Sequence, residues 1–218
     1  MRVTMKSLHV LILIIALLLP EATLAKNESP KIQFISLTAG GYLINLENFD
    51  DVYNSKMIFV VGANIGIPIS SKIGFYLKAN YLQKSGTPLI KTYSFQNGNL
   101  IIINERREGN AKFSMLFFNF GLQYNFLNSN NFTVGANGGI TWSRINETQE
   151  YQGGGYEING KGILGFFAGG MLEKKFQGKP FSVFTEIQYN MSRQDLLGFV
   201  GDYGGFNFNL GFRYYFSK

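Results

Sequence analysis

The chain has 218 residues, enough for one domain of moderate size, and it combines 26 glycines and 16% aromatic residues with no cysteine. The absence of cysteine excludes disulfide bonds, thiol catalysis and thiolate metal sites. The net charge of +6 comes from scattered lysines and arginines rather than from a basic stripe, so we expect no nucleic-acid partner.

The beginning of the chain has the composition of an export signal. Arg2 and Lys6 precede an apolar run over residues 8–19, and a small-residue cleavage site follows at residues 23–25. The apolar run is shorter than the roughly 20 residues that a membrane-spanning helix needs. These features predict a signal peptide that is removed on export, with an uncleaved anchor as the alternative.

The predicted cleavage divides the chain into three parts. Residues 1–25 are the signal peptide, residues 26–31 lead into the domain, and residues 32–218 form a β-barrel domain. Removal of the signal also removes His9, the only histidine, and lowers the net charge to +5, because two basic residues and one acidic residue are lost.

Large apolar side chains alternate with small or polar ones in eight segments of about the length that a tilted membrane strand requires, roughly 9–11 residues. The segments are residues 34–45, 57–68, 73–84, 112–126, 132–143, 164–176, 181–191 and 205–216. In the last of them Phe206, Phe208 and Leu210 share one face, opposite Asn207 and Asn209. The pattern predicts an all-β fold, an eight-stranded antiparallel transmembrane β-barrel with its large apolar side chains toward lipid.

The connections between these segments differ in length. Short links near residues 70–71, 128–130 and 178–180 alternate with longer polar links at residues 47–55, 85–110, 145–161 and 192–204. Outer-membrane barrels have short turns on the periplasmic rim and long loops on the outer rim. Aromatic residues flank the short links and predict a periplasmic girdle: Tyr124, Phe126, Phe132, Phe176, Phe181 and Phe216.

The longest link leaves the number of strands open. Asn97-Gly98 is a hairpin signal, and a turn there on the periplasmic side would give ten strands. That arrangement would place Lys91 against lipid, at a cost of about 2–4 kcal/mol at mid-bilayer. We therefore expect eight strands and a hairpin outside the membrane, with ten strands as the alternative.

With these patterns, the chain resembles the outer-membrane β-barrel family of Gram-negative bacteria, including its small PorT-like and OmpA-like members. The most specific match is a polar-x-Gly-x-x-apolar-x-aromatic pattern at Asn209, Gly211, Tyr214 and Phe216, which resembles the signal read by the barrel-assembly machinery. The family usually ends on the aromatic residue, whereas two residues follow Phe216 here. The resemblance implies location in the cell outer membrane, with membrane lipid and the assembly machinery as partners.

An enzymatic role is not expected. The outer-membrane acyl hydrolases and acyltransferases that this chain would have to match pair a serine with a histidine, and the exported chain has no histidine. An Asp/His protease is excluded on the same ground. We expect no catalytic, cofactor or metal site.

Charged side chains on the inward face predict a polar network in the lumen. Its expected members are Lys78, Glu173, Lys175, Glu186 and Arg213, with Glu186 and Arg213 paired across neighbouring strands. A barrel of eight strands has room only for side chains inside, so a structural network is favoured over a gate. Inward glycines are expected to make room for Tyr, Gln and Arg side chains rather than to line a channel: Gly62, Gly66, Gly121, Gly135 and Gly211.

The sequence thus predicts a non-enzymatic barrel with a structural or interaction role. Its long loops carry charges and tyrosines that are candidates for binding a protein partner: Tyr53, Tyr93, Tyr151, Tyr156 and Tyr203. Two alternatives stay open. One is a narrow pore, and the other is a soluble lipocalin-like barrel with its apolar face inward around a ligand.

Overall fold

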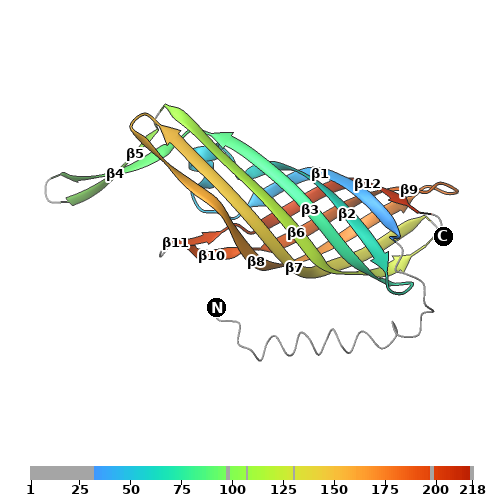
Figure 1. Ribbon diagram of the computed structural model, residues 1–218. Coiled ribbons are helices and arrows are strands. Elements are labelled where there is room, and N and C mark those ends of the chain that lie inside the picture. Colours follow the sequence, from blue (N-terminus) through green and yellow to red (C-terminus); the bar gives the residue numbers. More distant parts are fainter. Residues whose placement is uncertain (1–31, 97–98, 107, 130, 197–198, 217–218) are drawn as a thin grey trace, which may run out of the picture.

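The protein forms a closed barrel of eight antiparallel strands in a computed structural model that describes residues 32–96, 99–106, 108–129, 131–196 and 199–216 (Figure 1). The barrel strands are β1 (Phe34–Ile44), β2 (Met57–Pro68), β3 (Ile73–Gly86), β6 (Gly109–Asn128), β7 (Phe132–Tyr151), β8 (Gly154–Lys175), β9 (Phe181–Met191) and β12 (Gly205–Tyr215). The barrel closes where β1 pairs with β12, from Phe34 opposite Tyr215 to Ile44 opposite Gly205. The predicted signal peptide and its cleavage site lie outside the described residues.

Two hairpins stand apart from the barrel wall. Strands β4 (Leu89–Gln96) and β5 (Asn99–Arg106) pair only with each other, as do β10 (Arg193–Leu196) and β11 (Phe199–Asp202). Figure 1 shows β4 and β5 projecting well beyond one end of the barrel. The prediction of eight strands is confirmed, and the ten-stranded alternative is wrong because β4 and β5 do not join the wall.

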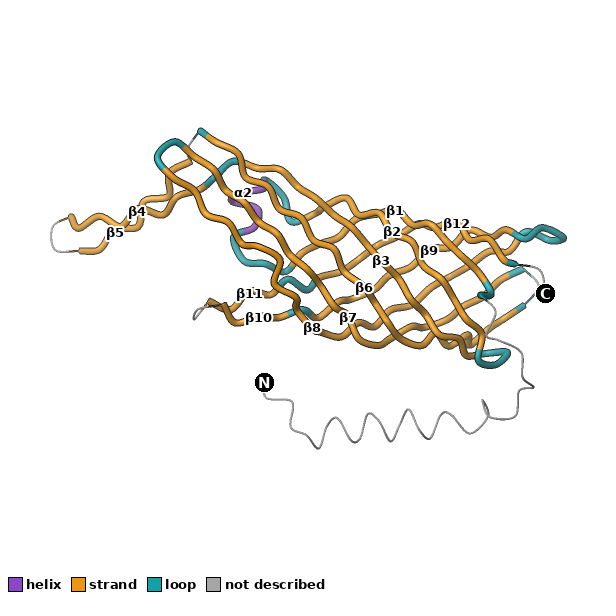
Figure 2. The backbone as a smooth tube through the Cα atoms, viewed as in Figure 1, coloured by secondary structure: helices purple, strands orange, loops and turns teal. Residues whose placement is uncertain are grey.

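The two ends of the barrel differ. We call the end with the links at residues 69–72, 129–131 and 176–180 the short-turn end, and the opposite end the long-loop end. Both Ile32 and Phe216 lie at the short-turn end, since the amide of Phe216 donates to the carbonyl of Gln33. The long-loop end carries both hairpins and a short helix, α2 (Phe49–Tyr53), between β1 and β2 (Figure 2).

Strand boundaries agree with the sequence pattern except at one place. Residues 145–161, predicted to be a loop, instead continue β7 and β8 as paired strands up to Tyr151 and Gly154, with a register shift after Ile145. The sequence predicts a loop there because the row of large lipid-facing side chains stops. The strands stay paired although that row is missing, because Ile145, Glu147 and Gln149 turn inward and are buried.

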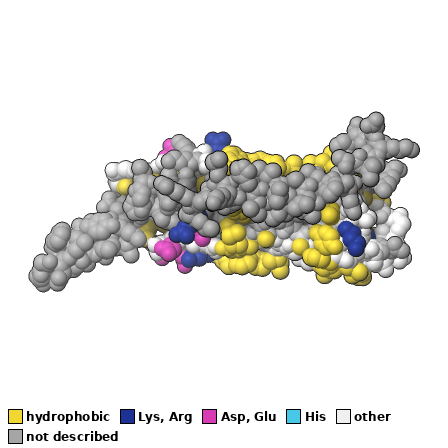
Figure 3. All heavy atoms as spheres, turned by 90° about the horizontal axis from the view of Figure 1, so that it is seen from below, with side chains coloured by type: hydrophobic (Ala, Val, Ile, Leu, Met, Phe, Trp, Pro, Cys, Tyr) yellow, Lys and Arg dark blue, Asp and Glu magenta, His cyan; other side chains and the backbone are white. Residues whose placement is uncertain are grey.

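The outer face of the wall is apolar, as predicted. Side chains more than half exposed occur on seven of the eight barrel strands, among them Leu37, Phe59, Phe75, Phe120, Leu164, Ile187 and Leu210. Figure 3 shows hydrophobic side chains along the middle of the barrel, with the visible charged side chains to either side. An apolar exterior contradicts the lipocalin-like alternative. No helix among the described residues is long and apolar enough to cross a membrane.

Candidate functional site: the barrel interior and its cap

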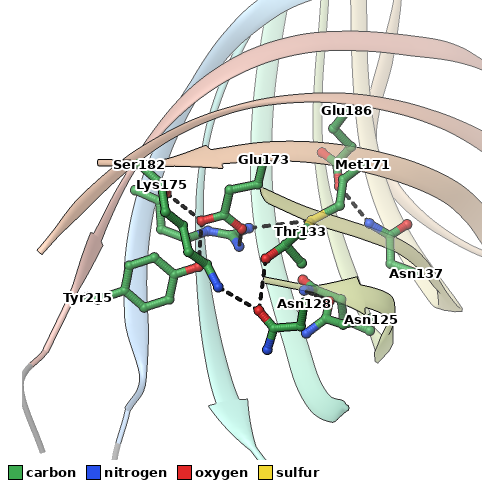
Figure 4. Close-up of polar contacts among 12 residues, drawn as sticks. Asn125, Asn128, Thr133, Asn137, Met171, Glu173, Lys175, Ser182, Glu186 and Tyr215 are labelled. Carbon is green, nitrogen blue, oxygen red and sulfur yellow. Dashed lines mark hydrogen bonds and ion pairs between the residues drawn. The ribbon is translucent and has the colours of Figure 1, made fainter. Parts of the chain in front are cut away.

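A buried ion pair lies inside the short-turn half of the barrel. The Nη1 atom of Arg213 on β12 is 2.7 Å from Oε2 of Glu173 on β8, and both side chains are fully buried. The hydroxyl groups of Ser182 and Tyr215 donate to the other carboxylate oxygen of Glu173 (Figure 4). Glu173 is therefore neutralised and hydrogen-bonded, as a buried charge has to be.

Two phenylalanine rings enclose the guanidinium group of Arg213. Its Cζ atom lies 3.8 Å from the ring centroid of Phe34 and 4.6 Å from that of Phe184. A Cβ atom at Gly66 would lie 2.1 Å from the Phe34 ring, and one at Gly211 would lie 2.3 Å from the Phe184 ring. These two glycines therefore make room for phenylalanine rings, and not for the Tyr, Gln and Arg side chains that were expected.

A second buried ion pair crosses the lumen. The Nζ atom of Lys78 on β3 contacts Oε2 of Glu186 on β9, and both side chains are fully buried. Tyr76 and Asn137 each donate a hydrogen bond of 2.7 Å to Oε1 of Glu186. The carboxylate of Glu186 on β9 is thus held by donors from β3 and β7, which ties opposite walls together.

The predicted pairing of Glu186 with Arg213 is not the one that forms. In the β9–β12 register Arg213 lies opposite Ser182 and Glu186 lies opposite Asn209. Four residues along a strand separate the two side chains by about 13 Å. Each charge instead pairs with a residue beyond the neighbouring strand.

Lys175 lies at the short-turn rim rather than within the lumen. Its Nζ atom donates to Oδ1 of Asn128 at 2.6 Å and lies 6.0 Å from the ring centroid of Tyr215. Tyr215 in turn donates to Glu173, so Lys175 borders the network without joining either ion pair (Figure 4).

The long-loop half of the interior is filled by an apolar core that sequence reasoning missed. Its members come from six barrel strands, from α2 and from the link before β12: Tyr42, Ile44, Phe49, Tyr53, Ile58, Val60, Leu82, Ala111, Phe113, Met115, Phe117, Ile145, Ile163 and Tyr203. A signal was present in runs that are apolar at every position, such as residues 57–61 and 115–118. One face of such a run meets lipid and the other fills the barrel.

Helix α2 covers this core. The Phe49 and Tyr53 rings stack with centroids 4.4 Å apart, and the Phe49 ring lies edge-on to Phe113 at 5.1 Å. The carbonyl of Val52 accepts a hydrogen bond of 3.0 Å from the amide of Thr87. A Cβ atom at Gly86 would lie 2.2 Å from that same carbonyl oxygen. The helix is therefore seated directly against the end of β3.

A tyrosine cluster surrounds Glu147 above the core. Tyr53, Tyr156 and Gln149 donate to its Oε1 atom at 3.0, 2.9 and 3.0 Å. Burial, followed by the negative charge of Glu147, raises the pKa of Tyr53, Tyr156 and Tyr203. We call α2 together with the residues around Glu147 the cap. Tyr53 and Tyr203 are buried, so two of the five tyrosines expected on the loop surface belong to the cap instead.

The comparisons with known proteins bear on the fold. No protein-family model and no curated protein matches the chain. A solved structure of Neisserial surface protein A matches with a TM-score of 0.55 at 10% identity, covering 84% of this chain and 96% of that one. This is the fold of the small outer-membrane β-barrels. The attachment invasion locus protein of Yersinia pestis also matches, with a TM-score of 0.46 at 11% identity, covering 86% of this chain and all of that one. The predicted fold class and family resemblance are confirmed at the level of fold.

In this outer-membrane barrel fold, β12 carries the residues of the predicted assembly signal. Asn209 is buried in the lumen, Tyr214 and Phe216 face outward, and Gly211 lies against the Phe184 ring. Their role in assembly stays a prediction. Among the described residues no three His, Cys, Asp or Glu side chains gather as a metal site would require.

Proposed function

We propose that this protein is a closed, non-enzymatic barrel of the bacterial outer membrane that presents a rigid platform of hairpins to a protein partner outside the cell. The short-turn end would face the periplasm and the long-loop end the exterior, as in other outer-membrane barrels. We further propose that the chain is exported with removal of residues 1–25 and is inserted by the barrel-assembly machinery. The signal-like composition of residues 1–25 supports the first step, and the pattern at Asn209, Gly211, Tyr214 and Phe216 supports the second.

The feature that carries the proposal is the long-loop end. Strands β7 and β8 have 20 and 22 residues, about twice the roughly 9–11 that span a membrane, so their upper halves form a hairpin beyond the apolar band. Together with the β4–β5 and β10–β11 hairpins they make three paired elements at one end. Ordered hairpins lose little conformational entropy when a partner binds, which favours recognition.

The filled interior argues against a pore. The two ion pairs occupy the short-turn half, and above them the apolar core and α2 cover the lumen. An ion would have to pass the buried ion pairs and then an apolar core whose members are at most 5% exposed. A narrow pore is therefore the weaker candidate.

Recovery of a partner from native membranes tests the platform. We expect chemical cross-linking to trap a defined protein on the wild type and not on a variant in which a short turn replaces residues 89–106. Both proteins should keep the heat-dependent gel mobility of a folded barrel. A Ser71→Ala variant, changed in a short turn at the opposite end, is the control and should keep the partner. Equal recovery with the shortened variant would contradict the proposal for this hairpin.

Fractionation and bilayer recordings test the remaining parts. The protein should be found in the outer membrane without residues 1–25, and recovery from the soluble periplasmic fraction would contradict the location. In planar bilayers neither the wild type nor Glu186→Gln should show steady conductance. A steady current that changes in Glu186→Gln would make the lumen network a gate instead of a structural filler.

A further inference from the structure

The turns and strand ends of the short-turn rim carry lysines and no acidic residue. Residues 67–74, 123–133 and 174–182, which form its turns and strand ends, include Lys72, Lys174, Lys175 and Lys179 and no aspartate or glutamate. The acidic residue next to them, Glu173, is buried and paired with Arg213. The long-loop end differs, since residues 46–56 alone carry both signs, with three acidic residues and one lysine.

Two of the four lysines line a polar hollow between two turns. The hollow has a volume of about 600 Å³ and lies between the β6–β7 and β8–β9 turns, with Ser129, Lys175, Gln177 and Lys179 among its lining residues. Two hydrogen bonds hold the turns together, Lys175 to Asn128 at 2.6 Å and Gln177 to Asn131 at 3.0 Å. Two ammonium groups thus line one small space at the membrane border, and such a pair of cations is suited to a phosphate group.

An apolar groove on the lipid-facing wall begins beside this hollow. It has a volume of about 660 Å³ and crosses β8, β9, β12 and β1, with Phe132 of β7 at its edge. The small side chains of Ala39 and Thr185 form its floor, because they lie in one row with the larger Leu172 and Leu210. Lys174 is the charged residue in its lining, and the next residue, Lys175, lines the polar hollow. The groove and the hollow are therefore neighbours across the end of β8, with Lys174 on its outer face and Lys175 on its inner face.

We propose that the hollow and the groove together form a site for one anionic glycerophospholipid of the periplasmic leaflet. The phosphate group lies between Lys175 and Lys179. Lys174, on the outer face of the wall, adds a third positive charge near the phosphate, and an acyl chain fills the groove over Ala39 and Thr185. Charge selects the lipid class, since a zwitterionic headgroup would bring its own ammonium group against three lysines. The inference rests on the proposed membrane location and orientation.

Native mass spectrometry of the purified barrel, released from micelles containing equal amounts of phosphatidylglycerol and phosphatidylethanolamine, tests the site. We expect one phosphatidylglycerol to be retained about 25-fold more than phosphatidylethanolamine, given a contribution of roughly fivefold from each of the two lysines that line the hollow. The triple variant Lys174→Gln, Lys175→Gln, Lys179→Gln should lose this preference. Lys72→Gln, which removes a lysine of the same rim from a different turn, should keep it.

A second variant separates the groove from the charges. Thr185→Trp places a large side chain in the groove without changing charge, and it should lower retention of phosphatidylglycerol severalfold. Heat-dependent gel mobility, measured for every variant, shows whether the barrel is folded, so loss of the lipid site is distinguishable from failure of the barrel assignment.

Three results would overturn the proposal. Retention that is equal in the wild type and the triple variant would remove the lysines from the site. An equal loss in Lys72→Gln would reduce the effect to the general charge of the rim. Dimers of the wild type that Thr185→Trp abolishes, with no lipid retained, would make the groove a contact between two copies of the chain.

Discussion

The two halves of the barrel interior are closed by opposite chemistry. In the short-turn half, Lys78 with Glu186 and Glu173 with Arg213 form ion pairs that are fully buried and hydrogen-bonded. In the long-loop half the same wall encloses an apolar core that is covered by α2. In the short-turn half of the apolar band the lumen is polar, and from the other half of the band outward the interior resembles that of a soluble protein.

The contrast shows that each half tolerates a different kind of change. Removing one member of a buried ion pair leaves an uncompensated charge, whereas replacing both members with apolar groups is often nearly neutral. Removing a large side chain from an apolar core leaves a cavity that the surrounding residues fill only in part. Matched substitutions in the two halves therefore separate electrostatic closure from packing.

Breaking the ion pair in the short-turn half should have the largest effect. Glu173→Gln keeps the size of the side chain but leaves the buried Arg213 without its countercharge, so we expect the free energy of unfolding to fall by about 3–5 kcal/mol. Denaturant unfolding of the barrel in micelles, followed by Trp142 fluorescence, measures the change.

The double variant Glu173→Gln, Arg213→Met is the control for this pair. It removes both charges and should regain much of the lost stability, since no unpaired charge remains. A double variant as unstable as the sum of the two single variants would show that the two side chains act independently.

A cavity in the long-loop half should cost nearly as much. Phe113→Ala removes the ring against which Phe49 and Tyr53 pack, and we expect a loss of about 3–4 kcal/mol. Because α2 rests on this ring, trypsin should also cleave faster after Lys56, which follows the helix. Phe120→Ala, on the lipid-facing side of the same strand, should leave that cleavage rate unchanged.

The sequence was sufficient to predict the wall but not the filling of the barrel. Period-two alternation depends on the outer face alone, so β2 and β9 were predicted with the bounds that the structure has. The pairing of charges depends on register, and the sequence does not show that Arg213 lies opposite Ser182. A contact across the lumen, such as Lys78 with Glu186, depends on closure of the barrel and has no local signature.

The cap was missed for a related reason. The link at residues 47–55 is polar at most positions, and only Phe49, Val52 and Tyr53 turn toward the core. Spacing of this kind over so short a segment does not distinguish a packed helix turn from a loop. The sequence likewise predicts a loop at residues 145–161, because strands beyond the membrane need no lipid-facing row.

Crowding the seat of α2 should have a moderate and local effect. Gly86→Ala places a Cβ atom against the carbonyl oxygen of Val52, and we expect a cost of about 1–3 kcal/mol as the helix shifts. Trypsin cleavage after Lys56 should accelerate while unfolding of the wall changes little. Gly138→Ala, whose Cβ would lie 3.4 Å from its nearest neighbour, is the control and should behave as the wild type.

Removing one donor from the Glu147 cluster should have the smallest effect and a distinct pH signature. Tyr53→Phe deletes one of three hydrogen bonds to Oε1 of Glu147, at an expected cost of about 1 kcal/mol. Because burial and Glu147 raise the pKa of Tyr53 in the folded protein, its contribution is fully present below the unfolded value of about 10 and is lost as the pH rises above it.

Tyrosinate absorbance measures this directly. The difference between wild type and Tyr53→Phe should show no ionisation step near pH 10 while the barrel is folded, and a step near pH 10 once both proteins are unfolded in denaturant. A step near pH 10 in the folded pair would mean that Tyr53 is exposed to water. The cap would then be open, and the apolar half of the interior would no longer be sealed in the way that distinguishes it from the half closed by ion pairs.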